Sequence, residues 1–274
     1  MNNLTQRAIT GIALVLLITV SVSWSPYSFI CLILVIDLLS LLEFYRLFHS
    51  ADLSPRKTAG VISSLSILVT CILTIGSISS WKILFINIPV IFGVFIFELY
   101  RKSEKPFHNL AFTFLGIICI TIPLCFFIAI AFLPFTKVLY HSGIILGYFF
   151  ILWVSDSGAY FIGKAFGTHP LFKRISPKKT WEGSLGGAVA AVLTAYIISL
   201  YFAIQNIAGW ISMALIIIVM GTFGDLIKSL MKRSLNLKDS GNILPGHGGM
   251  LDRFDTLLGS APFVFCYLIL FRQA

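Results

Sequence analysis

Acidic and hydroxyl side chains in the C-terminal half have the spacing of a metal site. If the chain around Asp225 is helical, polar residues three, four and seven positions apart share one face: Asp225, Lys228, Ser229 and Lys232. A carboxylate and a hydroxyl one turn apart are hard oxygen ligands, which Mg²⁺ combines with phosphate oxygens. This pattern predicts a magnesium site at Asp225 and Ser229.

A second acidic pair lies at the start of the last apolar run. Asp252 and Asp255 are one helical turn apart, and folding the preceding loop back would bring Asp252 beside Asp225. We therefore expect Asp225 and Asp252 to form a two-carboxylate metal site at the membrane surface. The alternative is that these acids only pair with neighbouring cations, Lys228 and Arg253.

Cations and glycines that suit phosphate binding flank these acids. Lys178 and Lys179 follow Ser176, and paired lysines are point charges suited to a triphosphate. The alternative for this stretch is a basic loop that attracts anionic lipid. In the turn His247-Gly248-Gly249, backbone N–H groups could approach an anion, although such a turn is weak evidence alone and His247 could be only a turn residue. Further polar candidates are Asp156, Lys238, Asp239 and Asp255.

The composition shows which kind of protein positions these residues. The 274 residues are 58% apolar and 11% charged, with a mean hydropathy of +0.95. Such a chain cannot cover a soluble surface with polar groups, which excludes a soluble enzyme, a disordered chain and a nucleic-acid-binding domain. The net charge of +9 reflects few acids, 11 against 20 basic residues, rather than a dense basic patch.

Long apolar runs predict an all-α polytopic membrane protein. A bilayer needs about 20 apolar residues per helix, and the alternation of a barrel is absent. We expect nine transmembrane helices: Ala8–Trp24, Tyr27–Phe44, Thr58–Ile78, Ile83–Phe97, Asn109–Leu133, Gly143–Phe161, Ser184–Ile204, Ile207–Thr222 and Thr256–Phe271. Residues 1–142 are expected to form a scaffold, with possible dimerisation, and residues 143–274 the catalytic region with two cytoplasmic basic loops.

The positions of Lys and Arg predict the orientation. With the N-terminus in the cytoplasm, three basic residues fall outside: Lys82, Lys137 and Arg272. The C-terminus is then expected outside and the polar stretches on the cytoplasmic side. The lack of a transit-type N-terminus favours a bacterial plasma membrane.

Isolated polar residues in the spans favour structural roles. Asp37 lies near the middle of the second run, where a charge costs about 2.5–3.5 kcal/mol on insertion scales, so a hydrogen bond is favoured over a substrate contact. Glu43 and Glu98, at span ends beside basic residues, are expected to form interfacial pairs. The cysteines are expected to be packing residues. Four histidines lack metal-ligand spacing, so zinc is not expected: His49, His108, His141 and His169.

Two sequence blocks resemble a known family. Ser229 to Asp255, SLMKRSLNLKDSGNILPGHGGMLDRFD, resembles the signature of the phosphatidate cytidylyltransferase, or CDP-diacylglycerol synthase, family. A second block, SDSGAYFIGKAFG followed by SPKKTWEG, also resembles the family, with Ser157 where Thr is common. The resemblance covers about residues 155–255.

The resemblance implies the reaction of CTP with phosphatidate to give CDP-diacylglycerol and pyrophosphate. It implies that the enzyme requires Mg²⁺, and it leaves open K⁺ as a second cation. It assigns the metal-binding positions to Asp225, Ser229 and Asp252. It also implies a homodimer in the membrane. Because the lipid phosphate is already an anion, we expect catalysis by positioning and charge neutralisation. The expected cations at the triphosphate are Lys178, Lys179, Lys232 and Arg233, and Arg253 or Lys164 is expected at the lipid phosphate.

Other classes remain as alternatives. A superfamily enzyme with another lipid acceptor, such as a CDP-archaeol synthase or a CTP-dependent polyprenol kinase, would need the same CTP and metal chemistry. An ion-coupled transporter is disfavoured because the polar groups cluster at one face rather than at broken helices in mid-membrane. Asp37 alone supports the transporter.

Overall fold

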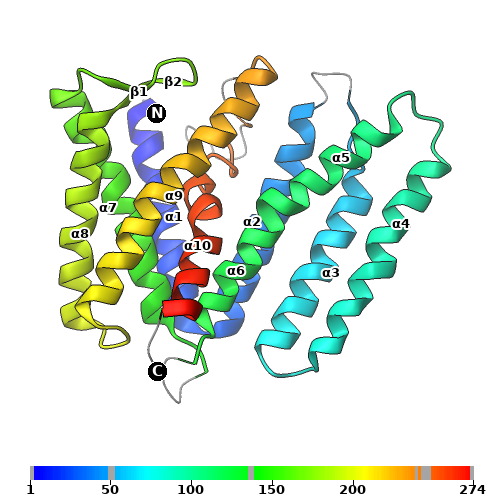
Figure 1. The fold of residues 1–274 in the computed structure, drawn as a ribbon, viewed down its shortest axis with the longest axis horizontal. Helices are drawn as coiled ribbons and strands as arrows, with labels where there is room; N and C mark the ends of the chain where they lie inside the picture. The colour runs from blue at the N-terminus through cyan, green and yellow to red at the C-terminus, as the bar shows by residue number, and fades with distance from the viewer. Residues whose placement is uncertain (1–2, 49–52, 135–138, 238–239, 242–247, 272–274) are drawn as a thin grey trace. The chain divides into compact units, whose positions relative to one another are not determined.

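The computed structural model describes residues 3–48, 53–134, 139–237, 240–241 and 248–271, and most of them are helical (Figure 1). The chain divides into two compact units. The first, unit 1, comprises Met1–Phe132 and Leu235–Phe254, and the second, unit 2, comprises Leu133–Ser234 and Asp255–Ala274. The segment 235–254 therefore belongs with the N-terminal helices. The roles expected of residues 1–142 and 143–274 stay predictions.

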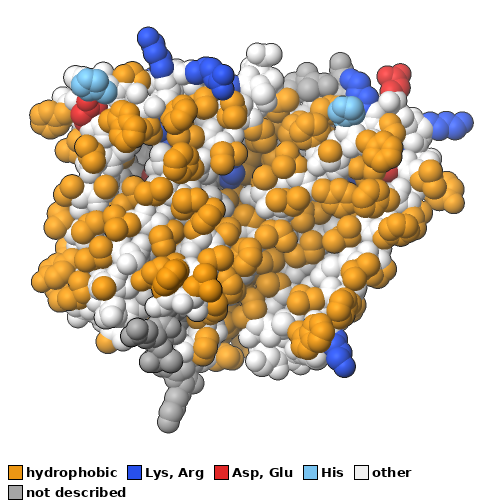
Figure 2. Space-filling view, viewed as in Figure 1, with side chains coloured by type: hydrophobic (Ala, Val, Ile, Leu, Met, Phe, Trp, Pro, Cys, Tyr) orange, Lys and Arg blue, Asp and Glu red, His pale blue; other side chains and the backbone are white. Residues whose placement is uncertain are grey.

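Within the described residues, seven helices are long and apolar enough to cross a membrane. They support the expected all-α membrane protein, and Figure 2 shows apolar side chains over the middle of the helices and charged ones near their ends. Two shorter apolar helices, Ile9–Trp24 and Asp255–Phe271, lie where the first and ninth spans were expected. The count of nine and the sides on which the termini lie stay predictions. The seven are Pro26–Leu47, Lys57–Ile75, Trp81–Leu99, Pro106–Ala131, Ser142–Phe166, Trp181–Tyr201 and Ile207–Ser234.

Unit 1 is built from helices that follow the predicted apolar runs. Ser25 caps α2, where its hydroxyl accepts from the Ser28 N–H at 3.1 Å and Pro26 occupies the first turn. The bounds are α1 (Asn3–Trp24), α2 (Pro26–Leu47), α3 (Lys57–Ile75), a 3₁₀ helix (Trp81–Ile86), α4 (Asn87–Leu99), α5 (Pro106–Gly116), a π-helical turn (Ile117–Thr121) and α6 (Ile122–Ala131).

A buried polar cluster joins three helical segments of unit 1. Asp37 on α2 is 1% exposed and accepts hydrogen bonds from the Ser64 hydroxyl and, at 2.9 Å, from the Thr121 hydroxyl. Thr121 ends the π-helical turn. Because a polar group away from water needs partners, these bonds agree with the structural role expected of Asp37.

The described residues of unit 2 form four helices and a small antiparallel hairpin. The elements are α7 (Ser142–Phe166), β1 (Pro170–Phe172), β2 (Ser176–Thr180), α8 (Trp181–Tyr201), α9 (Ile207–Ser234) and α10 (Asp255–Phe271). The hairpin pairs Pro170 with Thr180 and Phe172 with Ser176, in a connection for which no strand was predicted. Thr180 caps α8 by accepting from the Gly183 N–H at 3.2 Å.

Small residues let α7 and α8 approach closely. Gly183 and Gly187 are buried one turn apart on α8. A Cβ atom at Gly183 would lie 2.8 Å from the Ala159 carbonyl oxygen, and one at Gly187 would lie 2.8 Å from that of Ser155. In lipid the hydrophobic effect does not drive helices together, so their association depends on the close van der Waals packing that small residues allow.

Candidate active site

Helix α9 places the predicted polar residues on one face. It continues well past the apolar run to Ser234, as the predicted spacing requires. The Ser229 hydroxyl donates to Asp225 Oδ1 at 3.3 Å, one turn away. The Asp225 side chain is 23% exposed, so it is shielded from bulk water but still accessible.

Lys179 reaches Asp225 from the hairpin. Its ammonium group forms an ion pair with Asp225 Oδ2. Lys178 is the neighbouring residue on β2 and its side chain is exposed. Because successive side chains of a strand point to opposite faces, the two lysines cannot both face the same group on α9. The two lysines that the sequence suggested as a pair therefore have different surroundings: Lys179 contacts Asp225, and Lys178 is exposed.

Asp255 is the acid that α10 brings to Asp225. The two carboxyl groups share a side-chain hydrogen bond, and Asp255 Oδ1 also accepts from the Thr256 N–H at 2.7 Å. Glycines make the approach possible, since a Cβ atom at Gly224 would lie 2.6 Å from Gly259 Cα. The sequence named Asp255 only as a further polar candidate.

The oxygen atoms at this position suit a divalent cation. Asp225 and Asp255 would repel each other if both were charged, unless a proton or a cation lies between them. With Ser229 they offer two carboxylates and a hydroxyl, which fits Mg²⁺ bound by few protein oxygens and completed by phosphate or water. No group of three or more His, Cys, Asp or Glu side chains within the described part of the chain is placed to hold a metal ion.

Further positive charge surrounds the two acids. The positive charge of Lys232 lies close enough to Asp225 to attract its carboxylate, and that of Lys228 does the same for Asp255. Arg233, in the last turn of α9, is exposed. This cluster can balance negative charge beyond that of the two carboxylates, as a bound polyphosphate would require.

Asp252 lies in unit 1, whereas Asp225 lies in unit 2. Their expected pairing stays a prediction. Within unit 1, Asp252 Oδ2 accepts from the Ser240 N–H at 2.9 Å. Gly248 beside it has a positive φ of 86°, a conformation that favours glycine.

Glu43 corrects a sequence-based expectation. Instead of pairing with a basic residue at the interface, it is 1% exposed on α2 and its Oε2 accepts from the Leu251 N–H at 2.8 Å. The neighbouring cation Arg46 is exposed. A signal was present, because an acid between Leu42 and Phe44 in an apolar run needs buried donors, but the proximity of Arg46 concealed it. Glu98 does form its expected pair, with Arg56 Nε at 2.6 Å.

The other predicted residues lie on α7, on β2, in segment 235–254 or outside the described residues. Lys164 is exposed at the end of α7, Asp156 is exposed within the same helix, and Arg253 is exposed in segment 235–254. Ser176 begins β2 and is partly buried. Three candidates fall outside the described residues: Lys238, Asp239 and His247.

Comparison with known proteins identifies the family. The model of the cytidylyltransferase family matches residues 5–271. The chain belongs to the cytidylyltransferase family. It is 31% identical to a phosphatidate cytidylyltransferase of Staphylococcus haemolyticus over 237 residues, which cover 85% of this chain and 87% of that protein. The family resemblance predicted from the sequence is confirmed.

Two further relatives match over shorter regions. Proteins named phosphatidate cytidylyltransferase from Haemophilus influenzae and Bacillus subtilis are 42% identical over 139 residues and 48% identical over 124 residues. These alignments cover 48% and 44% of this chain, and the chain spans about half the length of these two relatives.

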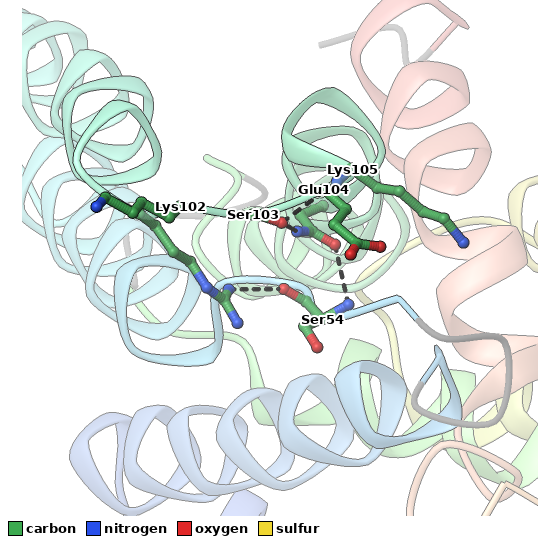
Figure 3. A pocket seen from close by; sticks show the side chains of 7 residues that line it. Ser54, Lys102, Ser103, Glu104 and Lys105 are labelled. Carbon is green, nitrogen blue, oxygen red and sulfur yellow. Dashed lines mark hydrogen bonds between the residues drawn. The ribbon is translucent and has the colours of Figure 1, made fainter.

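This cytidylyltransferase-family chain also has a polar pocket in unit 1 that includes none of the predicted site residues (Figure 3). The guanidinium group of Arg101 donates to the Ser54 carbonyl at 3.1 Å, and Asn109 Nδ2 donates to Ser103 Oγ at 2.8 Å. In Figure 3, Lys102 and Lys105 extend in different directions. These cations do not converge on one point, so the contacts tie together chain segments rather than form an anion site. The lining residues are Ser54, Arg101, Lys102, Ser103, Glu104, Lys105 and Asn109.

Proposed function

We propose that this chain transfers the cytidylyl group of CTP to phosphatidate, giving CDP-diacylglycerol and pyrophosphate, in phospholipid biosynthesis. Membership of the cytidylyltransferase family and the names of the relatives support this reaction. The observation that carries it is the contact of Asp225 with Lys179, Ser229 and Asp255, which combines oxygen ligands and a cation near the ends of membrane-spanning helices.

The chemistry requires charge management more than proton transfer. The phosphate of phosphatidate is an anion at neutral pH, and its attack on the α-phosphorus of CTP is opposed by repulsion between anions. Lys179 and Lys232 would neutralise the triphosphate, joined by Lys178 and Arg233. Arg253 or Lys164 would bind the lipid phosphate. Positioning and electrostatic stabilisation are the main catalytic terms in such transfers.

A magnesium ion is part of this proposal. Asp225 and Ser229, with Asp255 beside them, would hold it. The family resemblance also assigns a metal-binding role to Asp252, which we retain. When bound, Mg²⁺ supplies Lewis-acid polarisation of a phosphate oxygen. K⁺ as a second cation and a homodimer rest on the resemblance alone.

The location follows from the helices and the relatives. Apolar helices indicate a membrane protein, and the relatives come from bacteria. We propose the plasma membrane, with the site on the cytoplasmic side where CTP is available.

The deciding experiment is a transfer assay with purified protein in detergent, α-³²P-CTP, phosphatidate and Mg²⁺, with and without a chelator. The expected result is label in the lipid phase with release of pyrophosphate. Both products should be lost when the chelator is present. Folded protein that leaves phosphatidate unlabelled but transfers label from γ-³²P-CTP to polyprenol, with release of CDP, would redirect the acceptor assignment. Labelling that persists in the chelator would remove the metal from the mechanism.

A further inference from the structure

Both described ends of the loop that carries Asp252 meet at one buried side chain of unit 1. The Leu251 N–H donates to Glu43 Oε2 at 2.8 Å, and Leu251 is itself 1% exposed. Gly249, at the same end, and Gly241, at the other end, both lie against Glu43 Oε1, so closely that a methyl group on either would overlap it. We call Glu43 with residues 240–241 and 249–252 the loop anchor.

The loop anchor fixes Asp252 from both sides. Leu251, which Glu43 holds, precedes Asp252 in the chain. The Ser240 N–H, next to Gly241, donates to Asp252 Oδ2 at 2.9 Å. The Asp252 carboxylate is thus joined to two backbone segments, each of which contacts the same glutamate on α2.

The glycines explain why the loop can close in this way. Gly249 is buried and Gly241 is partly buried, and their missing side chains leave the space that the Glu43 carboxylate fills. From the sequence, Gly249 was a candidate for phosphate binding on the weak evidence of a glycine-rich turn. In the structure Gly249 lies against the Glu43 carboxylate, whose negative charge would repel a phosphate placed there.

A structural role alone does not account for the choice of a glutamate. An apolar residue would suit a buried place on α2 better, because a buried carboxylate loses its hydration. The carboxylate is retained where backbone N–H groups of the loop can donate to it, and hydrogen bonds to a charged acceptor are among the stronger ones.

We propose that Glu43 is a positioning residue, whose carboxylate holds the loop so that Asp252 is presented in one fixed arrangement. The consequence for turnover rests on the proposed function above. Glu43 acts through Asp252 and does not itself contact the reacting atoms.

The first test is hydrogen exchange of the intact protein in detergent, which needs no activity. Glu43→Ala removes the acceptor, so amides in residues 248–254 should exchange about tenfold faster than in the wild type. Glu43→Gln retains an acceptor oxygen and should show a smaller increase. Glu98→Gln is the matched control, since Glu98 is equally buried in unit 1 but contacts Arg56 and Asn109 instead of the loop. Unchanged exchange in Glu43→Ala would overturn the anchor.

The second test is steady-state kinetics of the same variants. Turnover of Glu43→Ala should fall about tenfold or more, with partial recovery in Glu43→Gln and a KM for CTP close to that of the wild type. Accelerated exchange with normal turnover would overturn the positioning role. If the wild type transfers no label, the proposed function fails, and the exchange result still decides whether Glu43 anchors the loop.

Because Glu43→Ala could fail to fold, Gly249→Ala provides an independent route. Its methyl group would displace the loop from Glu43 while leaving the carboxylate in place. The expected result is the same faster exchange of residues 248–254 with an unchanged exchange pattern in α3 and α4. Normal exchange of the loop in a folded Gly249→Ala protein would contradict the proposed contact.

Discussion

Asp225 takes its partners from elements that are distant in the sequence. Lys179 comes from β2 and Asp255 from α10, whereas Ser229 is one turn along the same helix. The alternative considered from the sequence was that Asp225 only pairs with Lys228 on its own helix. The ion pair of Asp225 is with Lys179, from the hairpin. Bringing a second acid to a partly buried acid costs free energy, and such groupings are found where a cation or a substrate offsets the cost.

Asp225→Asn should lower turnover by about 10² to 10³-fold, because the amide keeps the shape but loses the charge that would hold a cation. The measurement is the initial rate of lipid labelling at saturating CTP and phosphatidate, together with the thermal unfolding midpoint. Glu104→Gln, an exposed acid in unit 1, is the control and should retain the wild-type rate. Near-normal turnover of Asp225→Asn would remove this residue from the mechanism.

Lys179→Ala and Lys178→Ala should differ. Lys179 faces Asp225 and Lys178 is exposed on β2, so the first substitution should raise the KM for CTP about tenfold and affect the KM for lipid less. Lys178→Ala should have a smaller effect on both constants. Measuring both constants for each variant distinguishes the two lysines. Equal effects, or an unchanged CTP dependence in Lys179→Ala, would place the nucleotide elsewhere.

At the residue scale, spacing along one helix was predictable and contacts between helices were not. The face shared by Asp225 and Ser229 follows from helical geometry alone. The roles of Asp255 and Glu43 depend on where α10 and the segment 235–254 pack, and no local pattern contains that information. For Glu43, the nearby basic residue Arg46 suggested an interfacial pair and so concealed the tertiary contact.

At the element scale, the apolar runs located the helices well because the length of a span is set by the bilayer. The apolar run for α9 ends at Thr222, whereas the helix runs to Ser234. Only the spacing of the polar residues from Asp225 to Lys232 suggested this extension. The hairpin was missed. Its strands have only three and five residues, which is too short for a periodic signal.

The close packing of α9 on α10 is what brings Asp225 to Asp255, so Gly224→Ala should disturb the site without touching its side chains. The added Cβ atom would lie 2.6 Å from Gly259 Cα and must force the helices apart. Overpacking of this kind costs about 1–3 kcal/mol, so both the unfolding midpoint and turnover should fall.

Gly93→Ala on α4 is the matched control for this substitution. A Cβ atom at Gly93 would meet nothing within 4 Å, and alanine favours the helix over glycine. Its midpoint should be unchanged or slightly higher, with wild-type turnover. If Gly224→Ala behaves like Gly93→Ala, close approach of α9 and α10 is not needed for the reaction.

At the scale of the whole molecule, the two units are not the two halves of the sequence. Segment 235–254 follows α9 in the chain but belongs to unit 1. A split after residue 142, drawn from the location of polar residues, could not anticipate this. The loop is assigned to unit 1 by contacts such as that of Glu43 with Leu251, which join residues 208 positions apart.

Sidedness is the property of the whole molecule on which the proposed reaction depends, because CTP is available only in the cytoplasm. Lys173 lies between the two strands of the hairpin and Lys82 in the 3₁₀ helix before α4, and both side chains are exposed. The distribution of Lys and Arg places the first inside and the second outside. In intact cells, a membrane-impermeant maleimide should therefore label Lys82→Cys and not Lys173→Cys, and in inverted vesicles the reverse should hold. The unmodified chain gives the background from its five native cysteines, which all lie in apolar helices. Labelling of Lys173→Cys from outside the cell would put Lys179 and the hairpin on the side without CTP, and the proposed reaction would then be untenable even with an intact site.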